Sequence, residues 1–472
     1  MPKEFIVAIE LGSSKMTGIA GKKNMDGSIS VLSVVREDST SCIRKGVVYN
    51  IDKTVLCISN IIKKLETTLK TKIEKVYVGV GGQSIRSVKN VIVKDLPAGT
   101  IITQEIINEL MDANRSMTYP DLEILDAAIQ EFKVDSQYQL DPVGIQCSRI
   151  EGNFLNILQR KSFYRNLNKC FDNAGIAIAE MYLAPLALAD SVLTEAERRS
   201  GCVLVDLGAD TTTVSVFYKN ILRHLAVIPL GGNNVTKDIS TVQMEEDEAE
   251  RMKIKYGSAF TDNNEIDDTL RLPIDQERYV ESRKLIDIIE GRMDEIIENV
   301  WFQVPSEYVD KLLSGVILTG GGSNMKNIER AFRNHTHLQK VRIAKFVQQT
   351  INSNSPEITA KDGTMNTILG LLEKGDINCA GDEITNDLFT TDRPLSSGKN
   401  RNSDRPGVVQ TEAEKRAQEE ARKKQQEKEE ADRKAAQEKA ERERKAKKEN
   451  SITNKTLKNL KSFFKKMVEE EE

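Results

Sequence analysis

Three short glycine-bearing segments constrain the fold of this chain more than any other feature, because each one follows an apolar run that is typical of a buried strand. They are residues 10–15 (ELGSSK), 206–212 (DLGADTT) and 319–324 (TGGGSN). Glycine permits the positive φ of a tight turn and lets backbone N–H groups approach phosphate oxygens. One such loop usually serves the turn alone, but three of them, two rich in hydroxyl groups, favour a bound nucleotide.

The chain has the same predicted order of elements, a strand, a hydroxyl-rich turn and a second strand, near residue 5 and again near residue 202. At 472 residues the chain is longer than one hydrophobic core usually organises, so two or more lobes are expected. Two halves of similar topology would bring their turns to the two sides of one ligand. We therefore expect an α/β fold of two lobes with a nucleotide between them.

The charge of the chain argues against a nucleic-acid platform, which would usually be basic. The formal net charge is −4, and the part up to residue 409 carries more acidic than basic side chains. The six cysteines include no C-x-x-C motif and form no metal-ligand spacing with the three histidines, which predicts buried thiols in a reducing compartment. Glutamates at positions 4 and 10 interrupt any signal peptide, and no apolar run would span a membrane, so we expect a soluble, cytoplasmic body.

Local patterns predict several further elements. Residues 79–82 contain three glycines, but an alternating, strand-like run follows them and no helix opens there, so we expect a turn between strands. Helical segments are expected at 235–257 and 283–300, and strands at 202–207, 213–217 and 225–230. An earlier helix is predicted by apolar side chains at 3.6-residue spacing: Val55, Ile58, Ile61, Ile62, Leu65 and Leu69.

The composition changes after about residue 375. Residues 376–409 are rich in Asn, Asp, Ser, Gly and Pro, which predicts a flexible linker. Residues 410–450 consist largely of alanine, glutamine and charged residues, with acid-first pairs four apart but no apolar coiled-coil seam. They predict a solvated helical spacer, which would reach ~60 Å if it were fully helical.

The last segment, 451–472, predicts an amphipathic helix that lies on a membrane surface. Its apolar face and the lysines around it supply the side chains expected at the lipid: Leu457, Lys458, Leu460, Lys461, Phe463, Phe464, Lys465 and Met467. Apolar burial and attraction to anionic lipid would give weak, reversible binding. The alternative is docking into a protein groove, because the four glutamates that follow would be repelled by anionic lipid.

The three loops, with the segment 248–257 (EAERMKIKYG) between the second and third, resemble the superfamily of actin, sugar kinases and heat-shock chaperone ATPases. Within that superfamily the chain is similar to the FtsA family of bacterial cell-division proteins. The motifs that carry this resemblance are 76–90, 229–238, 315–322 and the terminal amphipathic helix. The resemblance covers residues 4 to about 375 and the C-terminal helix, and it leaves out the spacer.

The resemblance implies an actin-like, two-lobed α/β fold in which a subdomain is inserted. The implied parts are lobe 1 (1–75 and 161–200), the inserted subdomain (76–160), lobe 2 (201–375), the flexible linker (376–409), the charged helical spacer (410–450) and the membrane helix (451–472).

The resemblance also implies ATP with Mg²⁺ between the lobes. The phosphates would be held by Gly12, Ser13, Ser14, Lys15, Gly208, Asp210, Thr211 and Thr212. Ribose and adenine would contact Glu250, Lys253, Gly320, Gly321, Gly322 and Ser323. Glu10 and Asp206 would hold the metal through water, since Mg²⁺ keeps most of its hydration shell. For Asp210, capping of its own turn is the alternative.

Three departures from the family pattern bear on catalysis. Glu10 stands where many relatives carry Asp, and Ala209 and Asp210 replace the commoner pair of glycines. Residues 183–186 are apolar in the region where efficient ATPases of the superfamily place a polar residue to orient the attacking water. Because positioning that water is much of the catalysis, we expect a nucleotide-dependent switch with at most weak ATPase activity.

The function that the resemblance implies is that of a structural adaptor. It would tether FtsZ filaments to the inner face of the cytoplasmic membrane at the division septum, and it would assemble into actin-like filaments. A surface within 232–300 would bind the C-terminal peptide of FtsZ, with Arg283, Glu290, Arg292 and Glu295 as candidates. Other division proteins would be further partners.

Two other functions are compatible with such a fold. A pilus-assembly ATP-binding protein would capture a short peptide of a membrane protein and would need no lipid-binding helix of its own. A small-molecule kinase would use ATP as phosphoryl donor, but it would need a positioned base in the cleft and would leave the terminal helix unexplained.

Overall fold

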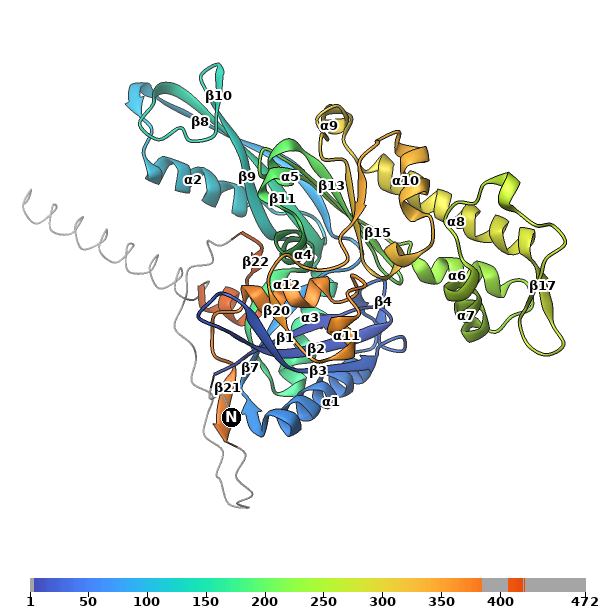
Figure 1. Cartoon of the computed structure of the whole chain (residues 1–472). Helices are drawn as coiled ribbons and strands as arrows, with labels where there is room; N and C mark the ends of the chain where they lie inside the picture. The colour runs from blue at the N-terminus through green and yellow to red at the C-terminus, as the bar shows by residue number, and fades with distance from the viewer. Residues whose placement is uncertain (1–3, 384–405, 419, 421–472) are drawn as a thin grey trace, which may run out of the picture. The chain divides into compact units, whose positions relative to one another are not determined.

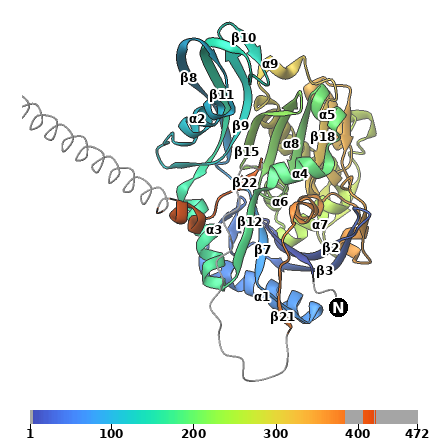
Figure 2. The ribbon, with the colours of Figure 1, turned by 90° about the vertical axis from the view of Figure 1, so that its left-hand side faces the viewer.

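The computed structural model describes residues 4–383, 406–418 and 420 of the chain. The described residues up to Thr411 form one compact unit that contains two large β-sheets (Figures 1 and 2). The described residues after it, 412–418 and 420, are helical, within the segment that the sequence predicts to be a charged helix. None of the described helices is long and apolar enough to cross a membrane.

The first sheet belongs to lobe 1 and has a mixed strand order. Across the sheet its strands are β20 (Ile351–Asn352), β3 (Ile29–Asp38), β2 (Lys15–Lys23), β1 (Ile6–Leu11), β7 (Lys75–Val80), β12 (Ala177–Leu183) and β22 (Val408–Val409). The helices of this lobe are α1 (Ile51–Leu69), α3 (Lys161–Ala174), α4 (Ala184–Val192) and α12 (Asn366–Lys374). α1 contacts α3 and lies on β2 and β3, whereas α12 contacts α4 and lies on β1, β2 and β7.

Two glycines of β2 allow helices to approach the sheet closely. A Cβ at Gly18 would lie 2.2 Å from the side chain of Ile61 in α1, and a Cβ at Gly21 would lie 2.8 Å from Leu372 in α12. The two helices therefore pack directly on the strand backbone, and any side chain at either glycine would push one of them away.

The sequence of α1 explains both its ends and its buried face. The Asn50 side chain accepts a hydrogen bond from the backbone N–H of Lys53 (3.0 Å), which caps the N-terminus, and Lys70 ends the helix in the left-handed conformation. The predicted apolar face is confirmed for its buried members, which are Ile58, Ile61, Ile62, Leu65 and Leu69.

Replacing Ile61 with alanine is expected to destabilise the protein by about 2–5 kcal/mol, because the side chain is fully buried and its loss leaves a cavity over Gly18. Leu56 lies on the same helix but is 61% exposed, so Leu56→Ala is the matched control and should cost far less. Equilibrium unfolding in urea measures both. Equal destabilisation by the two substitutions would contradict the packing described for α1.

The second sheet is formed by strands of lobe 2 and of the inserted subdomain. The strands of lobe 2 are β13 (Cys202–Leu207), β14 (Thr212–Tyr218), β15 (Ile221–Ile228), β18 (Val316–Thr319) and β19 (Val341–Ile343). Its helices are α5 (Glu195–Ser200), α6 (Gly232–Ser240), α7 (Glu246–Tyr256), α8 (Ser282–Phe302), α9 (Ser306–Val309) and α10 (Ile328–Thr336). The short helix α11 (Pro356–Thr359) lies with lobe 1, since its Glu357 faces Arg36 of β3. A small ribbon pairs β16 (Arg271–Pro273) with β17 (Tyr279–Glu281).

The inserted subdomain is built on three long antiparallel strands. Its elements are β8 (Arg86–Ile101), α2 (Gln104–Arg115), β9 (Leu122–Val134), β10 (Gln137–Gln139) and β11 (Gln146–Arg160). β8 joins the sheet of lobe 2 through one pair, Arg86 with Ala226 of β15. The inserted strands therefore extend the sheet of lobe 2, although they follow β7 of lobe 1 in the chain.

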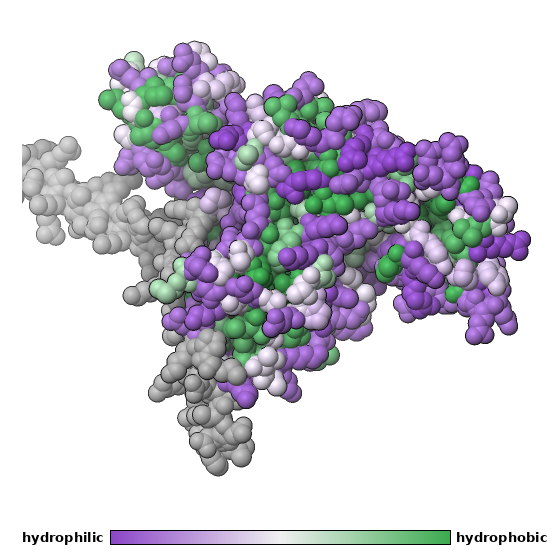
Figure 3. Space-filling view, in the orientation of Figure 1, coloured by the Kyte–Doolittle hydropathy of each residue, from purple (hydrophilic) through white to green (hydrophobic). Residues whose placement is uncertain are grey.

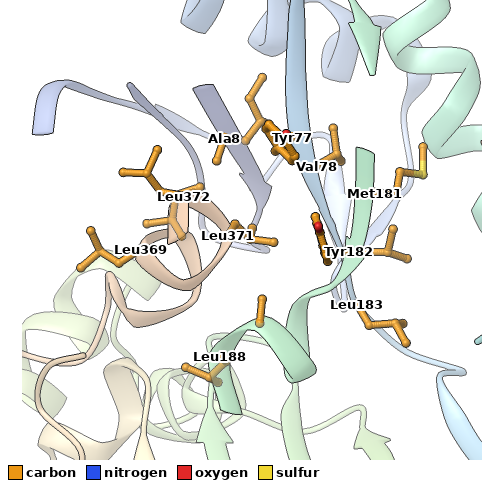
Figure 4. Close-up of a cluster of buried hydrophobic side chains, with 14 of the residues drawn as sticks. Ala8, Tyr77, Val78, Met181, Tyr182, Leu183, Leu188, Leu369, Leu371 and Leu372 are labelled. Carbon is orange, nitrogen blue, oxygen red and sulfur yellow. The ribbon is translucent and has the colours of Figure 1, made fainter. Parts of the chain in front are cut away.

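The two lobes repeat one local topology. β1 pairs antiparallel with β2 and parallel with β7, and β13 pairs antiparallel with β14 and parallel with β18. This repeat gives the chain the actin-like, two-lobed α/β fold that the sequence predicts. Figure 4 shows part of the core of lobe 1, where side chains of β1, β7 and β12 meet those of α4 and α12.

The helical material expected at 235–257 is confirmed and forms two helices, α6 and α7, separated at 241–245. The structure corrects two other predictions of local structure. The strand expected from residue 225 begins at Ile221. Both described ends of the predicted flexible linker, 376–409, are attached to lobe 1. β21 (Ala380–Glu383) pairs with β6 (Thr71–Ile73), and β22 pairs with β12. Because these pairings join residues far apart in the chain, local composition does not reveal them.

Candidate functional site

The first predicted phosphate loop is the tight turn between β1 and β2. A Cβ at Gly12 would lie 2.6 Å from the carbonyl oxygen of Lys15, so the turn requires glycine. The Ser39 hydroxyl donates to the carbonyl of Gly12 (2.6 Å), and the Ser13 hydroxyl accepts from the N–H of Gly46 (2.8 Å). Ser14 is half-buried and Lys15 is exposed.

The second predicted phosphate loop is the corresponding turn between β13 and β14. The N–H of Gly208 donates to the carbonyl of Thr211 (2.9 Å), and a Cβ at Gly208 would lie 2.8 Å from that oxygen. Thr211 is half-buried, whereas Thr212 is fully buried and its hydroxyl donates to the carbonyl of Leu230 (2.9 Å). The hydroxyl of Thr212 thus ties the start of β14 to the segment after β15 and does not face the open side of the loop.

Asp210 links the second loop to two other parts of the chain. Its carboxylate accepts from the Asn233 side chain at the start of α6 (2.7 Å) and from the backbone N–H of Lys45 (3.0 Å). Lys45 and Gly46 form the turn between β4 (Ile43–Arg44) and β5 (Val47–Val48). The 45–46 turn therefore hydrogen-bonds to both predicted phosphate loops, one in each lobe.

Sequence reasoning missed the 45–46 turn, although one signal was present. Gly46 has a φ of +71°, and Gly82 lies against it, since a Cβ at Gly82 would be 2.3 Å from the carbonyl of Gly46. The glycines of 79–82 end β7 and support this turn, which agrees with their interpretation as a turn between strands. The lysine–glycine pair at 45–46 was the available hint. Asn233 lies within the motif 229–238, but nothing in that motif indicated its contact with Asp210.

The predicted metal-binding carboxylates lie at equivalent positions of the two lobes. Glu10 is the penultimate residue of β1 and pairs with Thr17, and Asp206 is the penultimate residue of β13 and pairs with Thr213. Burial, together with the charge of Asp206, raises the pKa of Glu10 to about 8, although the Arg36 guanidinium opposes the rise. Burial alone raises the pKa of Asp206 to about 6. The two carboxyl groups are therefore neighbours across the two lobes.

This pair of carboxyl groups fits a hydrated divalent cation. A cation would stabilise both carboxylates in their ionised form and would offset the repulsion that helps to raise the pKa of Glu10. Mg²⁺ often binds through few carboxylates while it keeps several waters. No cluster of three or more His, Cys, Asp or Glu that could enclose a metal occurs in the described ranges. Two carboxylates with phosphate oxygens and water are the arrangement that these residues can support.

The third predicted loop closes against the second. Gly320 has a φ of +82°, and a Cβ there would lie 2.3 Å from Asp206 Oδ1 and 2.7 Å from the carbonyl of Leu207. A Cβ at Gly322 would lie 2.9 Å from the Leu207 side chain, and at Gly321 the nearest atom, in Thr364, is 3.7 Å away. The backbone of this loop therefore lies directly beside the metal-binding candidate of lobe 2.

Ser323 has a structural contact that the sequence did not indicate. Its side chain is fully buried, and its hydroxyl donates to the carbonyl of Gly320 (2.7 Å). This contact gives the hydroxyl a role in the shape of the loop. Among the glycines of the loop, Gly320 is buried, Gly321 is exposed and Gly322 is half-buried.

Glu250 and Lys253 lie on α7 and are tied to α6. Lys253 Nζ donates to the Thr236 hydroxyl (2.8 Å) and to the carbonyl of Gly232 (3.0 Å), and it forms an ion pair with Glu250 (2.6 Å). The Lys253 side chain is only 11% exposed, whereas that of Glu250 is 41% exposed. Lys253 thus fixes α7 against α6, and Glu250 is the member of the pair that is open to a ligand.

A separate groove of about 340 Å³ lies between α6 and α8 in lobe 2. It is lined by Asp238, Thr241, Ile288, Gly291, Arg292 and Glu295. Arg292 donates to Asp238 (2.5 and 3.1 Å) and also pairs with Glu295. Of the candidates for peptide binding, Arg292 and Glu295 therefore line this groove. Arg283 pairs with Asp268, and Glu290 faces Thr261.

The predicted membrane helix, 451–472, with its candidates from Leu457 to Met467, lies outside the described residues.

Comparisons with known proteins agree on one family. The family model described as "Cell division protein FtsA" matches residues 203–363, and the model described as "SHS2 domain inserted in FTSA" matches residues 82–158. The chain is 33% identical to the cell division protein FtsA of Porphyromonas gingivalis over 387 residues, which cover 80% of each chain. It is 32% identical to FtsA of Neisseria meningitidis (69% of this chain, 80% of that one) and 31% identical to FtsA of Bacillus subtilis (69% and 75%).

Among solved structures, the fold is similar to that of a chain in a PilM–PilN type IV pilus biogenesis complex. The TM-score is 0.54 with 14% identity, and the match covers 79% of this chain and 98% of that chain. At this identity the likeness concerns the fold alone.

Proposed function

Because the chain belongs to the FtsA family of cell-division proteins, we propose that it is an ATP-binding adaptor that tethers FtsZ filaments to the inner face of the cytoplasmic membrane at the division septum. The observation that carries the nucleotide part of this proposal is the meeting of Glu10 and Asp206 at the ends of equivalent strands, beside three glycine loops. The family supports this role over that of a pilus-assembly protein or a small-molecule kinase.

ATP would bind where these loops converge. The backbone N–H groups of the turns at Gly12 and Gly208 would hold the phosphates, and Glu10 and Asp206 would hold Mg²⁺ through water. The exposed part of Glu250 and the glycines of the third loop would contact the nucleoside. Mg²⁺ would supply charge neutralisation to the phosphates, and the protein would respond by holding its two lobes in a fixed relation.

Turnover of ATP would be weak. α4 begins at Ala184, directly after the fully buried Leu183, and its first turn continues with Pro185 and Leu186. These residues offer no side chain that could orient a water for attack on a phosphate. ATP would therefore act mainly by controlling assembly.

Self-association is supported by apolar side chains on the inserted subdomain. Figure 3 shows hydrophobic patches over this subdomain, at the upper left of the view. The exposed apolar residues there include Val91, Val93, Ile101, Tyr138 and Leu140. Exposed apolar groups gathered on one subdomain are typical of interaction surfaces. They would contact a neighbouring copy in a filament or another division protein.

The groove between α6 and α8 is the site we propose for the C-terminal peptide of FtsZ. It offers the apolar side chain of Ile288, an open position at Gly291, and charged groups of both signs at Asp238, Arg292 and Glu295. A peptide with apolar and charged side chains could use all of them, and it would compete for the ion pairs that Arg292 now makes.

Two comparisons test the adaptor function. Each measures the recruitment of labelled FtsZ from the same cell to a supported anionic bilayer in the presence of Mg²⁺-ATP. The full chain is expected to recruit FtsZ filaments, and a chain stopped at Asn450 should fail to do so because it lacks the amphipathic segment. Arg292→Glu should remain on the bilayer but lose most FtsZ recruitment. Arg283→Glu on the same helix is the matched control, because Arg283 does not line the groove.

The outcomes separate the parts of the proposal. Recruitment by the shortened chain would overturn the membrane role of residues 451–472. Equal recruitment by the two arginine variants would overturn the groove as the FtsZ site. If the full chain binds the bilayer and leaves FtsZ in solution, the tether itself is wrong.

A further inference from the structure

The short segment 406–411 is docked on the compact unit although it follows the long polar stretch of the chain. β22 pairs antiparallel with β12, with Met181 opposite Val409 and Tyr182 opposite Val408. The N–H of Leu183 donates to the carbonyl of Gly407 (2.8 Å). β22 thereby covers the outer edge of β12, which would otherwise present unpaired backbone groups at the end of the lobe 1 sheet.

The docked segment is buried as well as hydrogen-bonded. Val409 is 1% exposed, and Thr411 is also buried. Gly407 has a φ of +84° and lies against Leu186 of α4, whose side chain would be 3.3 Å from a Cβ at that position. Specific packing and hydrogen bonds therefore hold this segment on the compact unit.

The same segment also touches the inserted subdomain. The N–H of Gly407 donates to Asp126 Oδ2 in β9 (2.8 Å), and β22 contacts β9 as well as β12. Burial raises the pKa of Asp126, and hydrogen bonds from the N–H groups of Gly407 and Ala127 act against that rise. Figure 2 shows β22 beside β12 and close to β9. Residues 407–409 therefore join lobe 1 to the inserted subdomain.

A third contact comes from α3. The hydroxyl of Tyr164, a fully buried side chain, donates to the carbonyl of Gln410. Backbone groups of Gly407 and Gln410 thus bond to β9, β12 and α3, which lie far apart in the sequence. Because most of these bonds use the backbone, the segment is recognised as a strand more than by its side chains.

We propose that residues 406–411 are an intramolecular clamp that holds the inserted subdomain on lobe 1 and fixes the point from which the charged spacer leaves the body. The site on β12, β9 and α3 is a strand-binding site, and its occupant is the chain's own segment. Residues 384–405 number 22, which span up to ~70 Å when extended, so the segment can return to its own body. None of the residues that contact this segment is among those proposed to bind nucleotide, FtsZ or lipid.

The clamp has the properties of a releasable contact. Its ladder is only two residues long and lies at the edge of a sheet, where local opening costs less than global unfolding. Release would free the inserted subdomain on this side and lengthen the connection between the body and the spacer. An opened β12 edge would then accept another extended strand.

Gly407→Ala tests the clamp in the full chain. The alanine would be strained at a φ of +84° and would press on Leu186, so the segment should leave its site. Hydrogen–deuterium exchange is expected to become at least tenfold faster in peptides covering 406–411, 178–186 and 122–128. Gly144→Ala is the matched control, since Gly144 has a φ of +88° in the inserted subdomain and no atom within 4 Å of its added Cβ.

Two results would overturn the proposal. Faster exchange in 406–411 with unchanged exchange in 122–128 would mean that the segment does not hold the inserted subdomain. If residues 178–186 of the unmodified protein lose their protection from hydrogen exchange on dilution, the strand that pairs with β12 comes from a second copy.

Asp126→Ala is a second variant for the same test. It removes the acceptor for the N–H of Gly407 and should also speed hydrogen exchange in 406–411.

Discussion

Replacing Gly320 with alanine is expected to weaken ATP binding at least 100-fold. The added Cβ would lie 2.3 Å from Asp206 Oδ1 and 2.7 Å from the carbonyl of Leu207, and neither the strand backbone nor a carboxylate at its end can move away freely. The third loop would have to shift, and it would displace the proposed metal-binding group as it does so. A 100-fold loss corresponds to about 2.7 kcal/mol of binding free energy.

A substitution at a second glycine, Gly27, distinguishes the effect of the steric clash at position 320 from the effect of backbone strain. Gly27 has a φ of +83°, almost the same as the +82° of Gly320, but no atom lies within 4 Å of its added Cβ. Gly27→Ala therefore carries the strain of the left-handed conformation without the clash. Titration of both full-length variants with a fluorescent ATP analogue in Mg²⁺ measures the difference. If both variants bind ATP equally well, the third loop does not border the nucleotide.

The sequence identified the parts of the site that depend on local pattern. A glycine after a buried strand predicts a tight turn, and all three predicted loops are such turns, at Gly12, Gly208 and Gly320. The repeated order of strands predicted two similar lobes, which the pairing of β1 and β13 confirms. These features need only a few neighbouring residues to be recognised.

The features that the sequence did not reveal depend on partners far away in the chain. The N–H of Lys45 bonds to Asp210, and the N–H of Gly407 bonds to Asp126, across 165 and 281 residues. Composition predicted a linker around residue 407. It does not show that Val408 and Val409 pair with the edge strand β12. The hydroxyls of Thr212 and Ser323 point inward, and a list of hydroxyl residues in a loop cannot tell which of them face a ligand.

Replacing Glu10 with glutamine is expected to stabilise the metal-free, nucleotide-free protein at high pH. Burial, with the charge of Asp206, raises the pKa of Glu10 from 4.5 to about 8. A raised pKa means that folding favours the protonated form, so the stability that Glu10 contributes is complete below about pH 4.5. It is lost as the pH rises to about 8, and at 1.36 kcal/mol per pKa unit the total loss is a few kcal/mol.

Glutamine keeps the shape of the protonated group and does not titrate, so the variant should lack this pH dependence. In EDTA the two proteins should be equally stable near pH 4.5, and Glu10→Gln should be the more stable one at pH 8–9. Urea unfolding across this range measures the effect, and Glu4→Gln, at an exposed position just before β1, is the control. A variant less stable than the natural protein at pH 8 would show that Glu10 has a stabilising partner when ionised.

The response to ligand should have the opposite sign. Mg²⁺-ATP brings a cation to Glu10 and Asp206, which removes the cost of ionising two neighbouring buried carboxyl groups. The natural protein should therefore gain more stability from Mg²⁺-ATP at pH 8 than Glu10→Gln does. Above about pH 8, where both carboxyl groups are ionised, their repulsion would destabilise the metal-free protein. A cation between them would remove that repulsion, so the charge that destabilises the metal-free protein would be the charge that binds the metal.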